Sequence, residues 1–169
     1  MLLLGLDPGL QRTGWGVISS RDNAISFHAA GVVTSDPADP LAERLDSLYR
    51  GLQAVVQQYQ PDAAAVEETV INKNAGSSLK LGQARGVALL AAAHAGMPVT
   101  EYASKTVKRA VVGTGAAQKA QVAMMVQTLL PAAGPVKGDA ADALAVAVCH
   151  AHHRTHLARM AEIALEARR

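Results

Sequence analysis

The sequence predicts an α/β protein built on a mixed five-stranded sheet with helices on its faces. Three apolar segments within residues 1–34 are joined by short connections, which is typical of antiparallel hairpins. After residue 40, segments with helical spacing alternate with short apolar segments, which is the order of parallel strands joined through helices. The chain has 169 residues and 50% of them are apolar, so it suits one domain with a sizeable core.

The first three strands are expected near the N-terminus. Residues 2–6 are continuously apolar, as in a buried central strand, and Asp7, Pro8 and Gly9 follow directly and end or bend it. Residues 13–18 and 25–34 are expected to form the next two strands. Because the connections are too short for crossovers, neighbouring strands should run antiparallel.

A helix is expected after the loop at residues 36–40. Apolar residues recur there at helical spacing until Pro61 stops the helix: Leu41, Leu45, Leu48, Leu52, Val55 and Val56. Residues 63–67 are then expected to form a short buried strand that ends at Glu67.

The rest of the chain is predicted to be mainly helical. An Ala-rich helix over residues 77–95 follows a loop at residues 72–76, and a short strand over residues 99–102 completes the sheet. Two further helices are expected over residues 117–130 and 139–156.

The chain is expected to hold one domain and a tail. Residues 1–156 form the domain in this prediction. Residues 157–169 are helix-prone and charged, and we expect this segment to fray or to be disordered.

Composition excludes several classes of protein. No apolar stretch approaches the ~20 residues of a membrane-spanning helix, and the start lacks the basic region of a secretory signal. We therefore expect a cytoplasmic protein without a membrane partner. The single cysteine, Cys149, excludes an internal disulfide and a cysteine-rich zinc site, and is interpreted as a small apolar filler.

Positive charge is concentrated in the second part of the chain. Residues 101–169 carry nine Lys or Arg against five Asp or Glu, whereas residues 1–100 carry seven against nine. Five of the cations lie within a stretch of modest length: Lys105, Lys108, Arg109, Lys119 and Lys137. Such a patch can follow a phosphate backbone or be an ordinary solvated face, and charge alone leaves both interpretations open.

Four acidic residues occupy positions that solvation alone does not explain. Asp7 and Glu67 each end an apolar strand, whereas Asp139 and Asp142 lie at i, i+3 on one face of a helix, among small residues. An unpaired carboxylate on a buried strand is costly, and divalent cations such as Mg²⁺ are suitable partners. Two-metal phosphodiester cleavage needs such a cluster, because one ion activates the attacking water and the other stabilises the leaving oxygen.

Each acid also has a purely structural interpretation. Asp7 can form a turn before Pro8, and Glu67 can be a surface residue at a strand end. Asp139 can cap or begin a helix, and Asp142 can be a solvated helix residue. All four interpretations must hold together to replace the metal site, so the cluster is the favoured hypothesis.

Five segments together resemble the RuvC crossover-junction endonucleases. They occur in the family's order and spacing, and the resemblance extends to about His156. The segment at residues 79–86, combined with the Asp-x-x-Asp segment, is highly specific. The segments are Leu4-Gly5-Leu6-Asp7-Pro8-Gly9, Ala65-Val66-Glu67-Glu68, Leu79-Lys80-Leu81-Gly82-Gln83-Ala84-Arg85-Gly86, Val111-Val112-Gly113 and Asp139-Ala140-Ala141-Asp142-Ala143-Leu144-Ala145.

The resemblance implies an RNase H-like fold and a homodimer that nicks two opposed strands of a four-way (Holliday) junction. It also implies a requirement for Mg²⁺ or Mn²⁺, with two ions per site, and a RuvA–RuvB branch-migration complex as a partner. The four carboxylates named above fall on the family's metal-binding acids. Lys108 and Lys119 fall on positions similar to its DNA-contacting lysines, and we expect further DNA contacts from Lys73, Asn74, Lys80 and Arg85.

One residue departs from the family's pattern. Members often carry an aromatic residue a few positions after the strand-end glutamate, where it can stack on junction bases, and Val70 occupies that place here. Either Val70 or Ile71 wedges between bases instead, or the base contacts are weaker. The departure affects sequence preference and junction opening, and it leaves the predicted chemistry unchanged.

Four histidines cluster near the predicted end of the last helix: His150, His152, His153 and His156. Imidazoles suit transition metals, so a second metal site is one interpretation. A solvated or phosphate-facing helix end is the favoured one, because positive charge at a helix C-terminus is stabilised by the helix dipole.

Three other functions agree with parts of the sequence. A sugar-kinase-like ATPase also opens with a strand, an acid and a glycine-containing hairpin, but needs a second lobe that this chain is short for. A non-catalytic junction-binding module would be expected to lose an acid. A nuclease of RNA–DNA hybrids would share the fold, but the segment at residues 79–86 and the basic second half argue against it.

Overall fold

The computed structural model describes residues 1–21, 24–68 and 74–166, except the side chains of residues 157–166. Within these ranges, five strands form one sheet in the order β3-β2-β1-β4-β5. The strands β1 and β2 pair antiparallel, as do β2 and β3, whereas β1 pairs parallel with β4 and β4 with β5. The predicted mixed sheet is therefore confirmed. The strands are β1 (Leu2–Asp7), β2 (Arg12–Arg21), β3 (Ala24–Thr34), β4 (Ala63–Glu67) and β5 (Val99–Tyr102).

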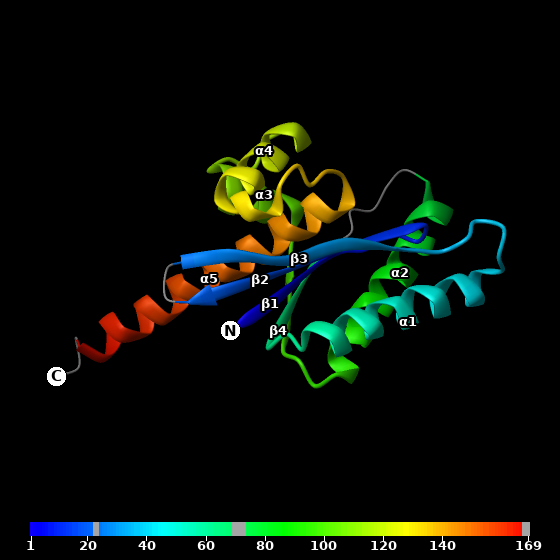
Figure 1. Ribbon diagram of the computed structural model, residues 1–169, viewed down its shortest axis with the longest axis horizontal. Helices are drawn as coiled ribbons and strands as arrows, with labels where there is room; N and C mark the ends of the chain where they lie inside the picture. The colour runs from blue at the N-terminus through cyan, green and yellow to red at the C-terminus, as the bar shows by residue number, and fades with distance from the viewer. Residues whose placement is uncertain (22–23, 69–73, 167–169) are drawn as a thin grey trace.

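Helices cover both faces of the sheet (Figure 1). The helices α1 (Leu41–Tyr59) and α2 (Ala75–His94) pack on one face. On the other face lie α3 (Ser104–Val112), α4 (Lys119–Leu129) and α5 (Asp139–Glu166). A 3₁₀ turn at Pro131–Ala133 connects α4 towards α5. None of the helices in the described part of the chain is long and apolar enough to cross a membrane.

Two helix predictions are corrected. The helix α3 was not predicted: it has nine residues, and its buried Val107 and Val111, at i, i+4, are a single pair with helical spacing. The helix α5 runs on to Glu166 instead of ending at His156. No Gly or Pro follows His156 to stop it, and its Ala, Leu, Met, Arg and Glu residues favour helix. The division into a domain and a tail stays a prediction.

Alternation along the strands divides the core into two layers. Leu3 of β1 packs with Ala63 and Ala65 of β4 beneath α5, and all three are buried. Their neighbours Leu4 and Leu6, with Ala64 and Val66, pack beneath α1 and α2. Asp7 lies four residues after Leu3 and Glu67 four residues after Ala63, so by the same alternation both acids lie on the α5 side of the sheet.

Small residues let α5 approach the sheet closely. A Cβ added to Gly5 would lie 2.1 Å from the backbone oxygen of Ala143, and one added to Gly14 would lie 2.0 Å from that of Asp139. Such contacts exclude any side chain, so glycine is required at both positions. The helix therefore crosses β1 and β2 almost backbone to backbone, and its first turn lies at the ends of these strands.

Candidate active site

The carboxylates of Asp7 and Glu67 lie at the ends of neighbouring parallel strands. Leu6 of β1 is in register with Val66 of β4, and each acid is the next residue along its strand. Both strands end at the same edge of the sheet, and the alternation described above directs both side chains towards α5. The predicted strand-end positions of these two acids are therefore confirmed.

The first turn of α5 adds two more carboxylates. Asp139 and Asp142 are its acidic first-turn residues, and the close contact at Gly14 places Asp139 beside β2. Asp7, Asp139 and Asp142 each bring one carboxylate oxygen within 4.8 Å of the other two. Glu67 is outside that group but shares a cavity wall with Asp7 and Asp142. Residues far apart in the chain thus meet as one acidic cluster.

A cavity of about 110 Å³ opens between these acids and the helices α3 and α4. We call it the acid cavity; its lining is Asp7, Glu67, Ser104, Val107, Lys108, Lys119, Val122, Asp142 and Ala145. Lys108 from α3 and Lys119 from α4 thus lie in the same cavity as the carboxylates. The structure brings these two predicted DNA-contacting lysines to the site.

Charge repulsion and burial are concentrated on Asp7. Burial, followed by repulsion from Glu67 and Asp142, raises the pKa of Asp7 to about 7. Lys119 opposes this rise and Asp139 adds to it. A carboxylate in such surroundings is ionised at a considerable free-energy cost unless a cation neutralises the cluster.

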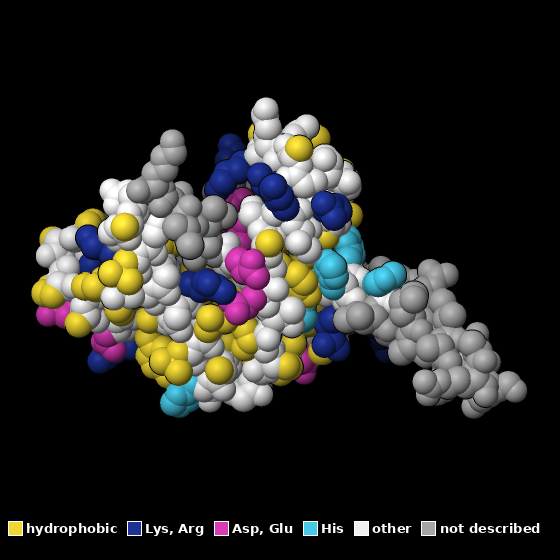
Figure 2. Space-filling view, turned by 180° about the vertical axis from the view of Figure 1, so that it is seen from behind, with side chains coloured by type: hydrophobic (Ala, Val, Ile, Leu, Met, Phe, Trp, Pro, Cys, Tyr) yellow, Lys and Arg dark blue, Asp and Glu magenta, His cyan; other side chains and the backbone are white. Residues whose placement is uncertain are grey.

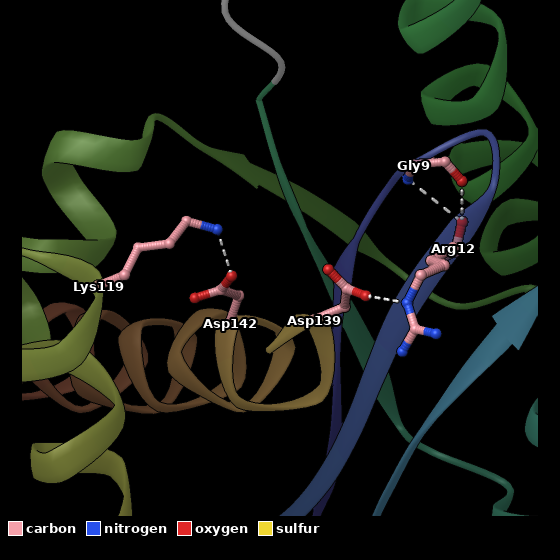
Figure 3. A network of polar contacts seen from close by, with 6 residues as sticks. Gly9, Arg12, Lys119, Asp139 and Asp142 are labelled. Atoms are coloured by element: carbon pink, nitrogen blue, oxygen red, sulfur yellow. Dashed lines mark hydrogen bonds and ion pairs between the residues drawn. The ribbon is translucent and has the colours of Figure 1, made fainter. Parts of the chain in front are cut away.

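The pKa values of Glu67 and Lys119 are also raised at this site. Burial raises the pKa of Glu67, and a hydrogen bond from the Ser104 hydroxyl opposes that rise. The hydrogen bond to Asp142 raises the pKa of Lys119. The Lys119 Nζ lies 2.7 Å from the Asp142 Oδ2, and this pair is drawn in Figure 3. The cation therefore offsets part of the negative charge next to Asp7.

Arg12 holds the other aspartate of α5. Its Nε donates to the Asp139 Oδ2 at 2.7 Å, so the two aspartates are paired from opposite sides (Figure 3). Arg12 is the first residue of β2, and no feature of its sequence neighbourhood marks it as a site residue. Sequence reasoning missed both Arg12 and Ser104, because their partners are remote in the chain.

The turn between β1 and β2 closes on itself. The Thr13 hydroxyl donates to the carbonyl oxygen of Gly9 at 2.9 Å and accepts from its N–H at 3.3 Å. Thr13 is 1% exposed. The Thr13 hydroxyl and the Gly9 N–H are therefore engaged within the turn itself.

The other predicted DNA contacts have different surroundings. Arg85 pairs with Glu101 through its Nε at 2.8 Å, on the α2 side of the sheet, away from the acid cavity. The Asn74 side chain caps α2 by accepting from the backbone N–H of Ser77 at 3.2 Å. Lys80 is exposed on α2. Lys73, like Val70 and Ile71, lies outside the described residues.

One face of the molecule combines these charges. Figure 2 shows acidic side chains in a hollow beside a lobe rich in Lys and Arg, with histidine side chains further along the same face. A negatively charged pocket flanked by cations suits a phosphodiester, because cations can bind its backbone and clustered carboxylates can bind metal ions.

The donor set fits divalent metal ions. Three carboxylate oxygens converge within 4.8 Å. Burial, followed by repulsion from Glu67 and Asp142, raises the pKa of Asp7, and a divalent ion bound there would favour its ionised form. Hard oxygen ligands favour Mg²⁺ and Mn²⁺ over softer metals. A mixed five-stranded sheet with an acidic cluster that could bind metal at the ends of two parallel strands is the arrangement typical of nucleases with an RNase H-like fold.

Comparison with known proteins identifies the family. The model of the family "Crossover junction endodeoxyribonuclease RuvC" matches residues 3–150. A relative of that name from Paramagnetospirillum magneticum is 58% identical over 154 residues, which cover 91% of this chain and 93% of the relative. One from Acidiphilium cryptum is 56% identical and covers 94% and 95%. This chain belongs to the RuvC family of crossover junction endodeoxyribonucleases.

Solved structures agree with that assignment. The Thermus thermophilus RuvC in complex with a Holliday junction substrate superposes with a TM-score of 0.85 at 34% identity, covering 92% of this chain and 96% of that one. The yeast mitochondrial Holliday junction resolvase Ydc2 shares the fold, with a TM-score of 0.72 at 13% identity over 97% of this chain and 85% of its own. The family and fold predicted from the sequence are confirmed.

Proposed function

We propose that this chain resolves four-way DNA (Holliday) junctions by paired symmetric nicks that leave ligatable 5′-phosphate ends, in recombination and DNA repair. The observation that carries the proposal is the acid cavity, where the carboxylates face Lys108 and Lys119. Support comes from membership of the RuvC family and from the similarity to a RuvC bound to a Holliday junction.

The four carboxylates would hold two divalent cations, Mg²⁺ or Mn²⁺. Asp7 belongs to both groupings, because it clusters with Asp139 and Asp142 and also shares the cavity wall with Glu67. It is therefore the residue best placed to be shared between two ions, with Glu67 and the α5 pair completing the ligand sets. When bound, the ions supply an activated water and stabilise the leaving oxygen.

The lysines would hold the scissile strand. The Lys119 side chain is 81% exposed and that of Asp142 17%, so the ammonium can leave the carboxylate and follow a phosphate. Lys108 lies on the same cavity wall and is free to take a neighbouring phosphate oxygen. Contacts to phosphate position the strand without reading its sequence.

A homodimer follows from the reaction, because two symmetric cuts need two sites related by a two-fold axis. The outer face of α2 is the best candidate interface. Leu79 and Leu90 are 67% and 56% exposed there, and a Cβ on Gly82 or Gly86 would meet nothing within 4 Å. Their spacing puts all four on one helical stripe, which a second copy of α2 would bury.

Two further assignments complete the proposal. By family membership we expect a RuvA–RuvB branch-migration complex as a partner. We place the activity in the bacterial cytoplasm, where the chromosomal substrate lies; the organisms of the similar RuvC proteins support this.

The test is nicking of a synthetic four-way junction with a short mobile core. Linear duplex and an RNA–DNA hybrid serve as matched substrates, each with Mg²⁺, with Mn²⁺ and with EDTA. We expect symmetric, metal-dependent cuts confined to the junction. If hybrid or duplex is cut in a metal-dependent way and the junction is left intact, the proposed metal site still stands but the proposed junction substrate is wrong.

The lysine contacts are tested by the salt dependence of junction binding in EDTA. Replacing Lys108 or Lys119 with Gln should flatten the slope of log affinity against log salt by about 1 each. Arg50→Gln, on α1 at the other face of the sheet, should leave the slope unchanged. If neither lysine replacement alters the slope, neither Lys108 nor Lys119 contacts a phosphate of the junction.

A further inference from the structure

The histidines near the end of α5 divide into two sets. His150 is buried at 4% exposure and its Nδ1 lies 2.9 Å from the Tyr102 hydroxyl. The other three line a hollow of about 280 Å³ between α3 and α5. We call it the histidine hollow; its lining is Thr106, Arg109, Ala110, His152, His153 and His156.

The histidine hollow offers hydrogen-bond donors and positive charge. Arg109 is always charged and presents a fork of N–H groups that suits phosphate. The Nδ1 of His152 lies 3.1 Å from the carbonyl oxygen of Ala110, and must donate to it because a carbonyl only accepts. Its Nε2 can then donate to a ligand only when the ring is protonated. The described residues that line the hollow include neither Asp nor Glu.

This chemistry selects an anion over a metal ion. A metal ion would meet the guanidinium of Arg109, which repels it. Among the described residues, the three aspartates of the active site form a group with ligand atoms within 4.8 Å, and these three histidines do not. An oxyanion such as phosphate would accept bonds from Arg109 and the imidazoles, and would favour their protonated forms.

The histidine hollow lies on the substrate side of the molecule. Asp142 and His152 are ten residues apart on α5, which corresponds to about 15 Å along the helix. Histidine side chains gather beyond the acidic hollow on the face that Figure 2 shows. One DNA strand carries a phosphate every ~3.4 Å along the duplex axis, so a duplex with one phosphate at the acid cavity has others about 15 Å away.

We propose that the histidine hollow is a second phosphate-binding subsite, which holds the backbone of a junction arm about 15 Å from the cleaved bond and binds it more tightly when its histidines are protonated. The proposal rests on the proposed junction substrate. The charged and titratable groups that line the hollow are Arg109 on α3 and His152, His153 and His156 on α5. The Tyr102 ring contacts that of His153, and His150 interacts with His153 and Arg154. None of these groups carries negative charge between pH 6 and pH 8, because Tyr102 has a pKa raised to about 12.

The experiment compares junction binding by the full chain in EDTA over a range of salt, at pH 6 and pH 8. The variants are Arg109→Gln and the double change His152→Gln with His156→Gln. His94→Gln, exposed at the end of α2 on the other side of the sheet, is the matched control. Thermal unfolding establishes that each variant is folded, and all altered side chains are exposed.

Arg109→Gln should flatten the slope of log affinity against log salt by about 1 at both pH values. Between 1 M and 0.1 M salt, the affinity of this variant for the junction should therefore rise roughly eightfold less than that of the wild type. The double histidine variant should show a comparable loss at pH 6 and little at pH 8. Slopes that overlay the wild type at both pH values would overturn the subsite.

A second arm separates DNA from free phosphate. Imidazole proton signals of His152 and His156 are followed by NMR while either a short duplex or inorganic phosphate is added at constant ionic strength. Signals that shift only with duplex, or that shift at a lower concentration of duplex than of inorganic phosphate, support the proposal. Shifts with inorganic phosphate alone overturn the DNA assignment. If the wild type binds duplex and hybrid as well as junction, the proposed substrate fails, whereas the subsite is still judged by the variant slopes.

Discussion

Gly5 and Ala143 touch across the interface between β1 and α5, where an added Cβ on Gly5 would lie 2.1 Å from the Ala143 backbone oxygen. This contact sets the distance between the strand that carries Asp7 and the helix that carries Asp139 and Asp142. The geometry of the acidic cluster therefore depends on the absence of one side chain.

Gly5→Ala should displace α5 and separate the carboxylates. We expect unfolding free energy to fall by roughly 1–3 kcal/mol, as for overpacked cores, and junction cutting to fall more steeply than junction binding. Urea unfolding and single-turnover cutting measure the two effects. Gly76→Ala is the control, because its added Cβ meets only Asn74 at 3.4 Å. Wild-type stability and cutting in Gly5→Ala would show that α5 has room to move.

Asp7→Asn should abolish cutting and stabilise the metal-free protein. The pKa of Asp7 is about 7 in the folded chain against 3.8 as the reference, so its ionisation costs stability as pH rises from about 4 to 7. At pH 8 the asparagine variant should gain up to roughly 4 kcal/mol of unfolding free energy without metal. Asp39→Asn, on the exposed loop before α1, should leave both properties unchanged.

The same variant tests metal binding without any cutting. Mn²⁺ should raise the melting temperature of the wild type, because binding to the folded state alone stabilises it. The melting temperature of Asp7→Asn should respond much less. An equal response of both proteins to Mn²⁺ would mean that Asp7 is not a ligand.

Arg12→Gln should disorder Asp139 and weaken metal binding. The Nε of Arg12 fixes one oxygen of Asp139, and loss of such partners commonly costs about 10–100-fold in metal affinity or activity. We expect a higher Mn²⁺ concentration for half-maximal binding in calorimetry, with Arg12→Lys intermediate. Arg21→Gln, at the far end of β2, is the control. Unchanged Mn²⁺ affinity in Arg12→Gln would show that Arg12 does not position Asp139 for metal binding.

His150 should make the fold sensitive to acid. Burial, with Arg154 and His153, lowers the pKa of His150 to about 4 from 6.5. The unfolded chain therefore binds the proton first, and stability should fall as pH drops from about 6.5 to 4, by up to roughly 3 kcal/mol. His150→Phe should flatten this part of the stability profile at the expense of the Tyr102 bond. Equal slopes in both proteins would assign the acid sensitivity to other groups.

Leu79→Lys combined with Leu90→Lys should convert the proposed dimer to monomers. Both side chains lie on the exposed stripe of α2, so charges there would repel across a two-fold axis. Sedimentation equilibrium at micromolar concentration measures the change, and Met124→Lys, equally exposed on α4, should stay dimeric. A wild type that sediments only as a monomer at this concentration would contradict the proposed dimer.

The strand ends and the paired aspartates were predictable because local pattern carries them. An apolar run that stops at Asp7 or Glu67 marks a strand end, and the i, i+3 spacing of Asp139 and Asp142 puts both on one helix face whatever the helix packs against. The short helix α3 was not predicted, although its buried Val107 and Val111 lie at i, i+4, because nine residues give only one such pair.

The amino-acid sequence by itself determined the mixed sheet, the family, and the positions of four acids at two strand ends and on one helix face. Each of these depends on the order of residues along the chain. Only the tertiary structure decided which cations meet those acids. In the structure, Arg12 pairs with Asp139 and Lys119 pairs with Asp142, whereas Arg85 pairs with Glu101 on the other face of the sheet. His150 is buried, and the neighbouring histidines line a hollow. The reason is physical: partners remote in sequence are chosen by the distance and angle at which α5 crosses the sheet, and that packing depends on contacts summed over the whole core.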